Sequence, residues 1–208
     1  MRITRLVAVA TAAVVASALS AAPAAAHTRT RSLAAVLAAD PSGFDRTGRD
    51  FDILQAAVGA VLAAKPASPV GVLADGTQPL TAFLPTDRAF QILVADLQHT
   101  RHLPGEKKAF TAVAALGIDT VESVLLYHVV PGATITGKAA RKSDGATLTT
   151  AAGGTVKVDV YGRHWKRIQL IDADRDDRNP RIVRFDINKG NKQIAHAIDR
   201  VLRPINLP

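Results

Sequence analysis

The chain has 208 residues, with 26 Lys and Arg against 18 Asp and Glu, a formal net charge of +8 and no cysteine. The absence of cysteine excludes a disulfide framework, a Cys-ligated zinc site, an iron–sulfur cluster and a thiol nucleophile. With 48% hydrophobic and 21% charged residues, the chain has the composition and length of one folded domain with a sizeable core, not of a disordered protein.

The first 26 residues have the pattern of a secretory signal peptide. Arg2 and Arg5 precede an apolar run without charge, Leu6–Ala16, and the segment closes with Ala24-Ala25-Ala26. A basic start, an apolar stretch and a small-residue cleavage site are typical of exported proteins. A membrane anchor is the alternative, which we disfavour because the charge-free stretch is only weakly apolar and has Pro23 near its end.

Cleavage after Ala26 would divide the chain into a signal peptide at 1–26, a flexible N-terminus at 27–30 and one domain at 31–205. Loss of the two signal-peptide arginines would lower the net charge from +8 to +6. We therefore expect a secreted, extracellular monomer of bacterial type, with no membrane span after cleavage. Its remaining positive charge favours polyanionic partners through long-range attraction.

Apolar spacing and capping residues predict helices in the first half of this domain. Thr86 precedes a helical pattern and is expected to cap that helix with its hydroxyl group. The predicted helices cover Leu33–Ala39, Asp50–Ala64, Asp87–Leu97, Glu106–Leu116 and, after a capping box at Asp119–Glu122, a segment ending at Leu126. A strand is expected at Leu80–Leu84, and the turn-forming residues of Pro66–Gly76 predict a loop.

After Pro131-Gly132 the pattern changes from helical to extended. Short segments, often β-branched or alternating, are separated by Gly, Asp and Asn clusters, which is typical of strands. The predicted strands are Ala133–Thr136, Ala146–Thr150, Thr155–Tyr161, Arg167–Ile171, Arg181–Ile187 and Gln193–Val201. A run of helices followed by a run of strands indicates an α+β fold, with the helices packed on one side or end of a sheet or sandwich.

Three segments resemble the signature of the fasciclin (FAS1) family. They are Leu80–Phe90 (LTAFLPTDRAF), Val124–Gly132 (VLLYHVVPG) and Ile194–Pro204 (IAHAIDRVLRP), in the family's order and at about its spacing. The resemblance implies an α+β fold in which helices pack on a small β-sandwich or wedge of short strands. It also implies an extracellular adhesion or interaction module. The chain departs from the family in its long, charged region at 161–191.

Tyr127 and His128 are candidate binding residues because the resemblance links this Tyr-His pair to cell adhesion through integrins in animal members. The alternative, which we favour, is structural: Tyr127 packs in the core and His128 binds a backbone carbonyl. His196 alternates with Ile194 and Ile198, so we expect an inward-facing histidine with satisfied hydrogen bonds rather than a ligand or a base.

A second candidate binding patch surrounds the single tryptophan. Arg163, Lys166 and Arg167 place three positive charges around Trp165, and alternate residues of a strand face the same way. Such a patch can hold sulfate, phosphate or carboxylate polymers, with the indole ring as a flat contact surface. The alternative is an ordinary charged strand with Trp165 folded onto the core.

No metal or cofactor is expected from the sequence. Asp172, Asp174 and Asp176 begin like a calcium loop, but the glycine and glutamate required at the sixth and twelfth positions are missing, so the pattern predicts a solvated turn. His99 and His102 have helical spacing but lack an evident third ligand nearby.

The pattern favours a secreted adhesion or interaction module whose partner is an extracellular protein or a polyanionic surface polymer. The chain carries no G-x-S-x-G, H-E-x-x-H, P-loop or G-x-G-x-x-G motif, so we expect no enzyme activity, although a hydrolase remains a weaker alternative. A carrier of a small apolar ligand is the other alternative. Nucleic-acid binding is not expected, since no reader motif accompanies the modest charge.

Overall fold

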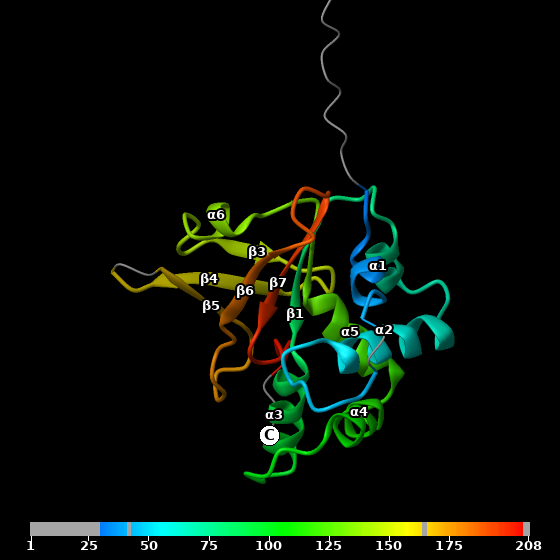
Figure 1. Cartoon of the computed structure of the whole chain (residues 1–208). Helices are drawn as coiled ribbons and strands as arrows, with labels where there is room; N and C mark the ends of the chain where they lie inside the picture. The colour runs from blue at the N-terminus through cyan, green and yellow to red at the C-terminus, as the bar shows by residue number, and fades with distance from the viewer. Residues whose placement is uncertain (1–29, 41–42, 164–165, 206–208) are drawn as a thin grey trace, which may run out of the picture.

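The computed structural model describes residues 30–40, 43–163 and 166–205 (Figure 1). The expected signal peptide and its cleavage after Ala26 lie outside these residues and stay predictions. Helices dominate up to Tyr127 and strands dominate after it, as the sequence pattern indicates. The helices are α1 (Leu33–Leu37), α2 (Asp52–Ala64), the 3-10 helix η1 (Pro69–Ala74), α3 (Asp87–Leu97), α4 (Glu106–Ala114), α5 (Ile118–Tyr127) and α6 (Gly137–Ala140).

The strands form two sheets. A four-stranded sheet has the order β2-β1-β7-β6 and a three-stranded antiparallel sheet the order β3-β4-β5. β1 and β7 pair in parallel, while β2 and β6 run antiparallel to them at the edges. The strands are β1 (Leu80–Pro85), β2 (Val129–Pro131), β3 (Thr147–Thr149), β4 (Thr155–Tyr161), β5 (Arg167–Ile171), β6 (Ile182–Ile187) and β7 (Gln193–Ile198).

The central pair β1–β7 is covered on both faces, which explains why every residue of these two strands is buried. Side chains alternate along a strand, so Ala82 and Leu84 join the core beneath the helices, whereas Phe83 joins the core between the sheets. Figure 1 shows the same division: α1, α2, α4 and α5 lie on one side of β1–β7, and β3, β4 and β5 lie on the other. The predicted α+β fold is confirmed.

Three local predictions are wrong. Ala133–Thr136 is not a strand; the short strand lies at Val129–Pro131, because the Thr81 side chain instead bonds the Ala133 carbonyl and the Ile135 N–H. The last large helix starts after Gly117, not at a capping box. The Pro66–Gly76 loop contains η1, whose inner residues are buried under the helices.

No single helix among the described residues has both the length and the apolar character needed to cross a membrane. α4 and α5 pass that test only when taken together, and they are bent by 107° relative to each other.

Candidate functional site

A groove of about 580 Å³ lies where the start of α3 meets β6, β7 and the segment that precedes α2. Six of its lining residues are arginines, contributed by four separate parts of the chain: Arg49, Arg88, Arg178, Arg181, Arg184 and Arg200. Among the described residues that line it, Asp199 is the only acidic one. We call this feature the arginine groove.

Most of these arginines have no acidic partner. Within the described part of the chain, Arg49, Arg88, Arg178 and Arg181 form no ion pair. Asp199 forms no ion pair with a described arginine; one of its oxygens accepts the backbone N–H of Arg181 at 2.7 Å, and its single negative charge leaves the lining strongly positive. Unpaired guanidinium groups that face one hollow create a positive potential, which attracts anions.

The remaining two arginines are held at the sides of the groove. Arg200 pairs weakly with Asp96 and Asp177, at 3.7 and 3.5 Å. The guanidinium of Arg184 lies over the ring of Phe51, 5.0 Å from its centroid. Planar guanidinium groups bind carboxylate, sulfate or phosphate through paired N–H donors, so the groove has the chemistry of an anion-binding site.

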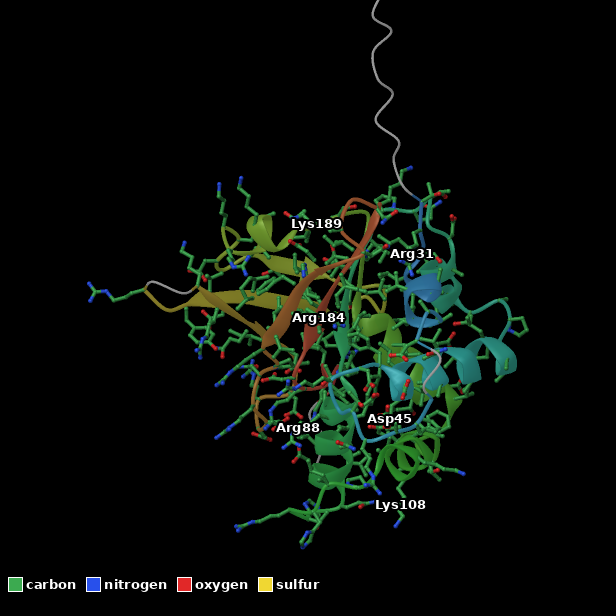
Figure 2. All side chains as sticks on the ribbon, viewed as in Figure 1. Arg31, Asp45, Arg88, Lys108, Arg184 and Lys189 are labelled. Atoms are coloured by element: carbon green, nitrogen blue, oxygen red, sulfur yellow. The ribbon has the colours of Figure 1, made fainter. Side chains whose placement is uncertain are left out.

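Backbone hydrogen bonds fix the position of Arg88. Thr86 caps α3 through its side chain, as predicted, and the Arg88 N–H donates to the carbonyl of Gly48 at 3.0 Å. Figure 2 shows Arg88 near the start of α3, with Arg184 above it on β6. The Gly48–Arg49 segment and the start of α3, which form two walls of the groove, are therefore joined by a backbone hydrogen bond. The groove is a feature of the folded backbone.

The predicted tryptophan patch lies elsewhere. Arg163, Lys166 and Arg167 are exposed at the end of the β4–β5 hairpin, which projects from the body of the molecule (Figure 1). Trp165 lies outside the described residues. None of the three cations lines the arginine groove. The hairpin therefore offers a second positive surface, separate from the arginine groove.

Tyr127 and His128 are both buried in the interior. The Tyr127 hydroxyl donates to the carbonyl of Thr155 at 2.7 Å. The two ring nitrogens of His128 contact the Val124 carbonyl at 2.7 Å and the Leu202 N–H at 2.9 Å. Burial lowers the pKa of His128 to about 4, so the ring is neutral. Neither side chain is available on the surface for a partner.

His196 also faces inward. Its Nε2 lies 2.9 Å from the Ile135 carbonyl and its Nδ1 accepts the Asp186 N–H at 3.2 Å. Burial lowers its pKa as well. The neighbouring gap between the sheets has a volume of about 20 Å³, room for about one water molecule, so no observation there favours a carrier of a small apolar ligand.

The Asp172–Asp176 segment is not the solvated turn predicted. Asp174 is buried and pairs with Arg203 at 3.2 Å, and Asp172 accepts the backbone N–H of Arg203 at 2.9 Å. Burial raises the pKa of Asp172 to about 6. Within the described chain, neither His99 nor His102 belongs to a group of three possible metal ligands.

The arginine groove was missed because its members are far apart in the sequence. Adjacent charges such as Lys166-Arg167 stand out in a sequence, whereas Arg49 and Arg88 reach the groove only through tertiary packing. The available signal was the spacing of Arg178, Arg181 and Arg184, three cations within seven residues of the region that departs from the family pattern.

Comparison with known families matches residues 55–204 to the Fasciclin domain. Among solved structures, the chain resembles a FAS1 domain pair from the insect cell adhesion molecule fasciclin I, with a TM-score of 0.56 and 20% identity. The match covers 83% of this chain and 50% of that one, so this chain spans about half the length of the solved pair. No curated protein matches. The family match covers more than half of the sequence and confirms the resemblance: the chain belongs to the fasciclin domain family.

Proposed function

We propose that this protein is a secreted adhesion or interaction module that binds a polyanionic surface polymer through the arginine groove. The observation that carries the proposal is the charge of the lining: six arginines and one aspartate surround a single hollow. The insect protein with the similar fold is named as a cell adhesion molecule, which agrees with a role in surface contact.

The composition of the groove suits a polymer better than a small ion. Arginines line it from the Gly48–Arg49 segment, from α3, from the segment after β5 and from β6, so they are spread along the hollow. Val183, whose exposed fraction is 57%, adds an apolar contact between them. A chain bearing repeated sulfate or carboxylate groups can engage several guanidinium groups at once, whereas one small anion reaches only one or two.

The test is binding of the purified protein to immobilised heparin, as a sulfated probe, and to alginate, as a carboxylated probe. A groove variant carries Arg88→Gln, Arg178→Gln and Arg181→Gln. Each surface arginine that contacts an anion contributes about 1 kcal/mol, so the three changes together are expected to weaken binding about 100-fold. Binding by the unchanged protein is expected to weaken steeply with salt.

The matched control changes Arg163, Lys166 and Arg167 to Gln, which removes the same amount of charge from the hairpin. It is expected to weaken binding less than threefold, as long-range attraction alone would. If the hairpin variant lost more affinity than the groove variant, the contact would belong to the β4–β5 hairpin. If neither heparin nor alginate bound at low salt, the proposal of a polymeric partner would be overturned. An acidic protein surface would then be the remaining class of partner.

A further inference from the structure

Five carboxylate side chains gather on the helical side of the molecule, where three helices begin. Asp52, Asp87 and Glu106 are the first residues of α2, α3 and α4, and Asp45 and Asp50 lie in the segment before α2. One oxygen from each of Asp45, Asp50 and Asp52 lies within 4.8 Å of the other two, and the same holds for Asp50, Asp87 and Glu106. Asp50 joins the two groups. We call these five residues the carboxylate cluster.

Some of the cluster oxygens have structural partners. Asp87 accepts the backbone N–H groups of Asp52 and Ile53, at 3.1 and 2.8 Å, and so caps α2. Glu106 accepts the Asp45 N–H at 2.5 Å through Oε2. The two Asp87 bonds use free N–H groups at the start of α2, where the helix dipole also favours negative charge. The bonds described above satisfy both carboxylate oxygens of Asp87 and one of the two oxygens of Glu106.

Asp45 is exposed, and its oxygens accept the N–H and the hydroxyl group of Thr47. Four other oxygens of the cluster are buried without any partner among the described residues. Oδ1 of Asp50, both carboxylate oxygens of Asp52 and Oε1 of Glu106 accept no hydrogen bond from a described residue. The exposed fractions of Asp52 and Glu106 are only 4% and 2%. One Asp52 oxygen lies within 4.8 Å of oxygens of Asp45 and Asp50. This oxygen has no hydrogen-bond partner, since neither oxygen of Asp52 has one. Buried polar atoms normally find a partner, so these oxygens call for a donor or a cation that the described residues do not supply.

No cation of the described chain compensates the cluster. None of its five members forms an ion pair with a described Lys, Arg or His. The oxygens of each group lie within 4.8 Å of one another, so their negative charges repel. A bound cation would relieve this repulsion.

We propose that the carboxylate cluster binds a calcium ion, with Asp50 and Asp52 as its central ligands. The donors are all oxygens, which suits a hard cation and not a thiophilic one. Calcium–oxygen distances of about 2.3–2.6 Å allow two ligand oxygens to be at most about 4.6–5.2 Å apart. The oxygens of each group of three lie within 4.8 Å of one another, which is compatible with one shared ion. Magnesium requires a tighter octahedron and usually retains several waters, so it fits five irregularly placed carboxylates less well.

The position of the ion would connect the cluster with the arginine groove. The Asp50 carbonyl accepts the Asp87 N–H at 3.1 Å, and the Gly48 carbonyl accepts the Arg88 N–H. Gly48 and Arg49 form part of the groove wall, so an ion held by Asp50 would fix that wall against α3. The ion site stands on its own; only this connection rests on the proposed function.

The test uses the full-length protein, stripped of metal with a chelator and dialysed, at pH 7.5. Calcium chloride is titrated by calorimetry, and thermal unfolding is followed with and without calcium. At a 100-fold excess over the dissociation constant, calcium is expected to raise Tm by about 5–10 °C for a domain of this size. Magnesium at the same concentration is expected to raise it by less than half of that.

Asp52→Asn is the test variant. It removes a buried charge from the cluster, so we expect the metal-free variant to unfold at a higher temperature than the metal-free original, while its calcium affinity falls at least tenfold. Asp119→Asn is the control, because Asp119 lies on the exposed face of α5 and the change in charge is equal. The control is expected to bind calcium like the original protein.

Three results would overturn the site. The first is no heat and no shift in Tm up to roughly 10 mM calcium, a concentration above the dissociation constants of the weakest extracellular calcium modules, about 1 mM. The others are equal calcium affinity of Asp52→Asn and the original protein, and tighter binding of magnesium than of calcium. Heparin binding is measured separately in chelator. If heparin binds in chelator and calcium does not bind, only the proposed calcium site is wrong. If calcium binds and heparin does not, only the proposed function of the groove is wrong.

Discussion

His128 shows how one buried side chain joins two segments that are distant in the sequence. Its ring bridges the Val124 carbonyl of α5 and the Leu202 N–H that follows β7. The pattern requires a neutral ring with the proton on Nδ1, because a backbone carbonyl only accepts and a backbone N–H only donates. Protonation of Nε2 would remove the acceptor that the Leu202 N–H needs.

This arrangement predicts a loss of stability in acid. The pKa of His128 is about 4 in the folded chain and about 6.5 in the unfolded one. Between these values the unfolded state binds the extra proton, so stability falls as pH falls from about 6.5 to about 4, by about 3 kcal/mol in all. His128→Asn should be less stable at pH 7 but lose less stability on acidification, as urea unfolding at pH 7 and 4.5 would measure.

His196 also lowers the stability of the folded protein as the pH falls, because burial lowers its pKa too. The comparison therefore uses the difference between the original protein and His128→Asn, with His196 present in both. An unchanged pH slope in the variant would show that His128 is not the group that titrates.

At the scale of elements, the turn between β3 and β4 packs against α5 with no room to spare. A Cβ atom on Gly154 would lie 2.8 Å from Cε2 of Tyr127, whose ring is held by its hydroxyl bond to Thr155. The Tyr127 ring fills the core between the two sheets, so it has no free space to move into. The family's tyrosine thus fixes the position of the three-stranded sheet.

Gly154→Ala is expected to destabilise the protein by about 1–3 kcal/mol, because overpacking shifts a buried aromatic ring. Gly59→Ala is the matched control: Gly59 is an exposed residue inside α2, and a Cβ there meets nothing within 4 Å. The control should stabilise by about 0.5–1 kcal/mol, since alanine favours helix. Chemical denaturation measures both, and equal effects of the two substitutions would contradict the packing argument.

Elements whose signals are local could be predicted from the sequence. The helix after Thr86 formed as expected because its cap and its apolar face lie within the twelve residues from Thr86 to Leu97. The strand predicted at 133–136 failed because the competing partner, the Thr81 side chain, is about fifty residues away. Asp119, expected as the cap of the next helix, instead lies within α5 and accepts a hydrogen bond from Lys65, the residue that follows α2, at 2.8 Å.

The candidate site could not be predicted from the sequence, because its residues come together only through contacts between distant segments. Charges adjacent in sequence pointed to the β4–β5 hairpin, whereas the groove is assembled from arginines more than a hundred residues apart. The carboxylate cluster likewise joins the starts of three helices, and only Asp50 and Asp52 are near neighbours. Sequence can reveal the number of charges, but only packing determines which of them share one hollow.

For the whole molecule, the opposite charges of the arginine groove and the carboxylate cluster are separated by one short segment. Figure 2 shows Arg88 and Asp45 in the same lower half of the molecule. Without a cation, the cluster's negative charge would lower the positive potential felt by a polymer in the groove. A bound calcium ion would neutralise part of that charge and also hold the Gly48–Asp50 segment in place.

The two sites are therefore expected to cooperate. Saturating calcium should tighten heparin binding about 3–10-fold at 0.15 M salt, and by linkage heparin should tighten calcium binding by the same factor. Both affinities can be measured by calorimetry in each order of addition, with Asp52→Asn as the variant in which the coupling disappears. Equal heparin affinities with calcium and with chelator, in a protein shown to bind calcium, would mean that the wall is rigid without the ion and that its charge does not reach the groove.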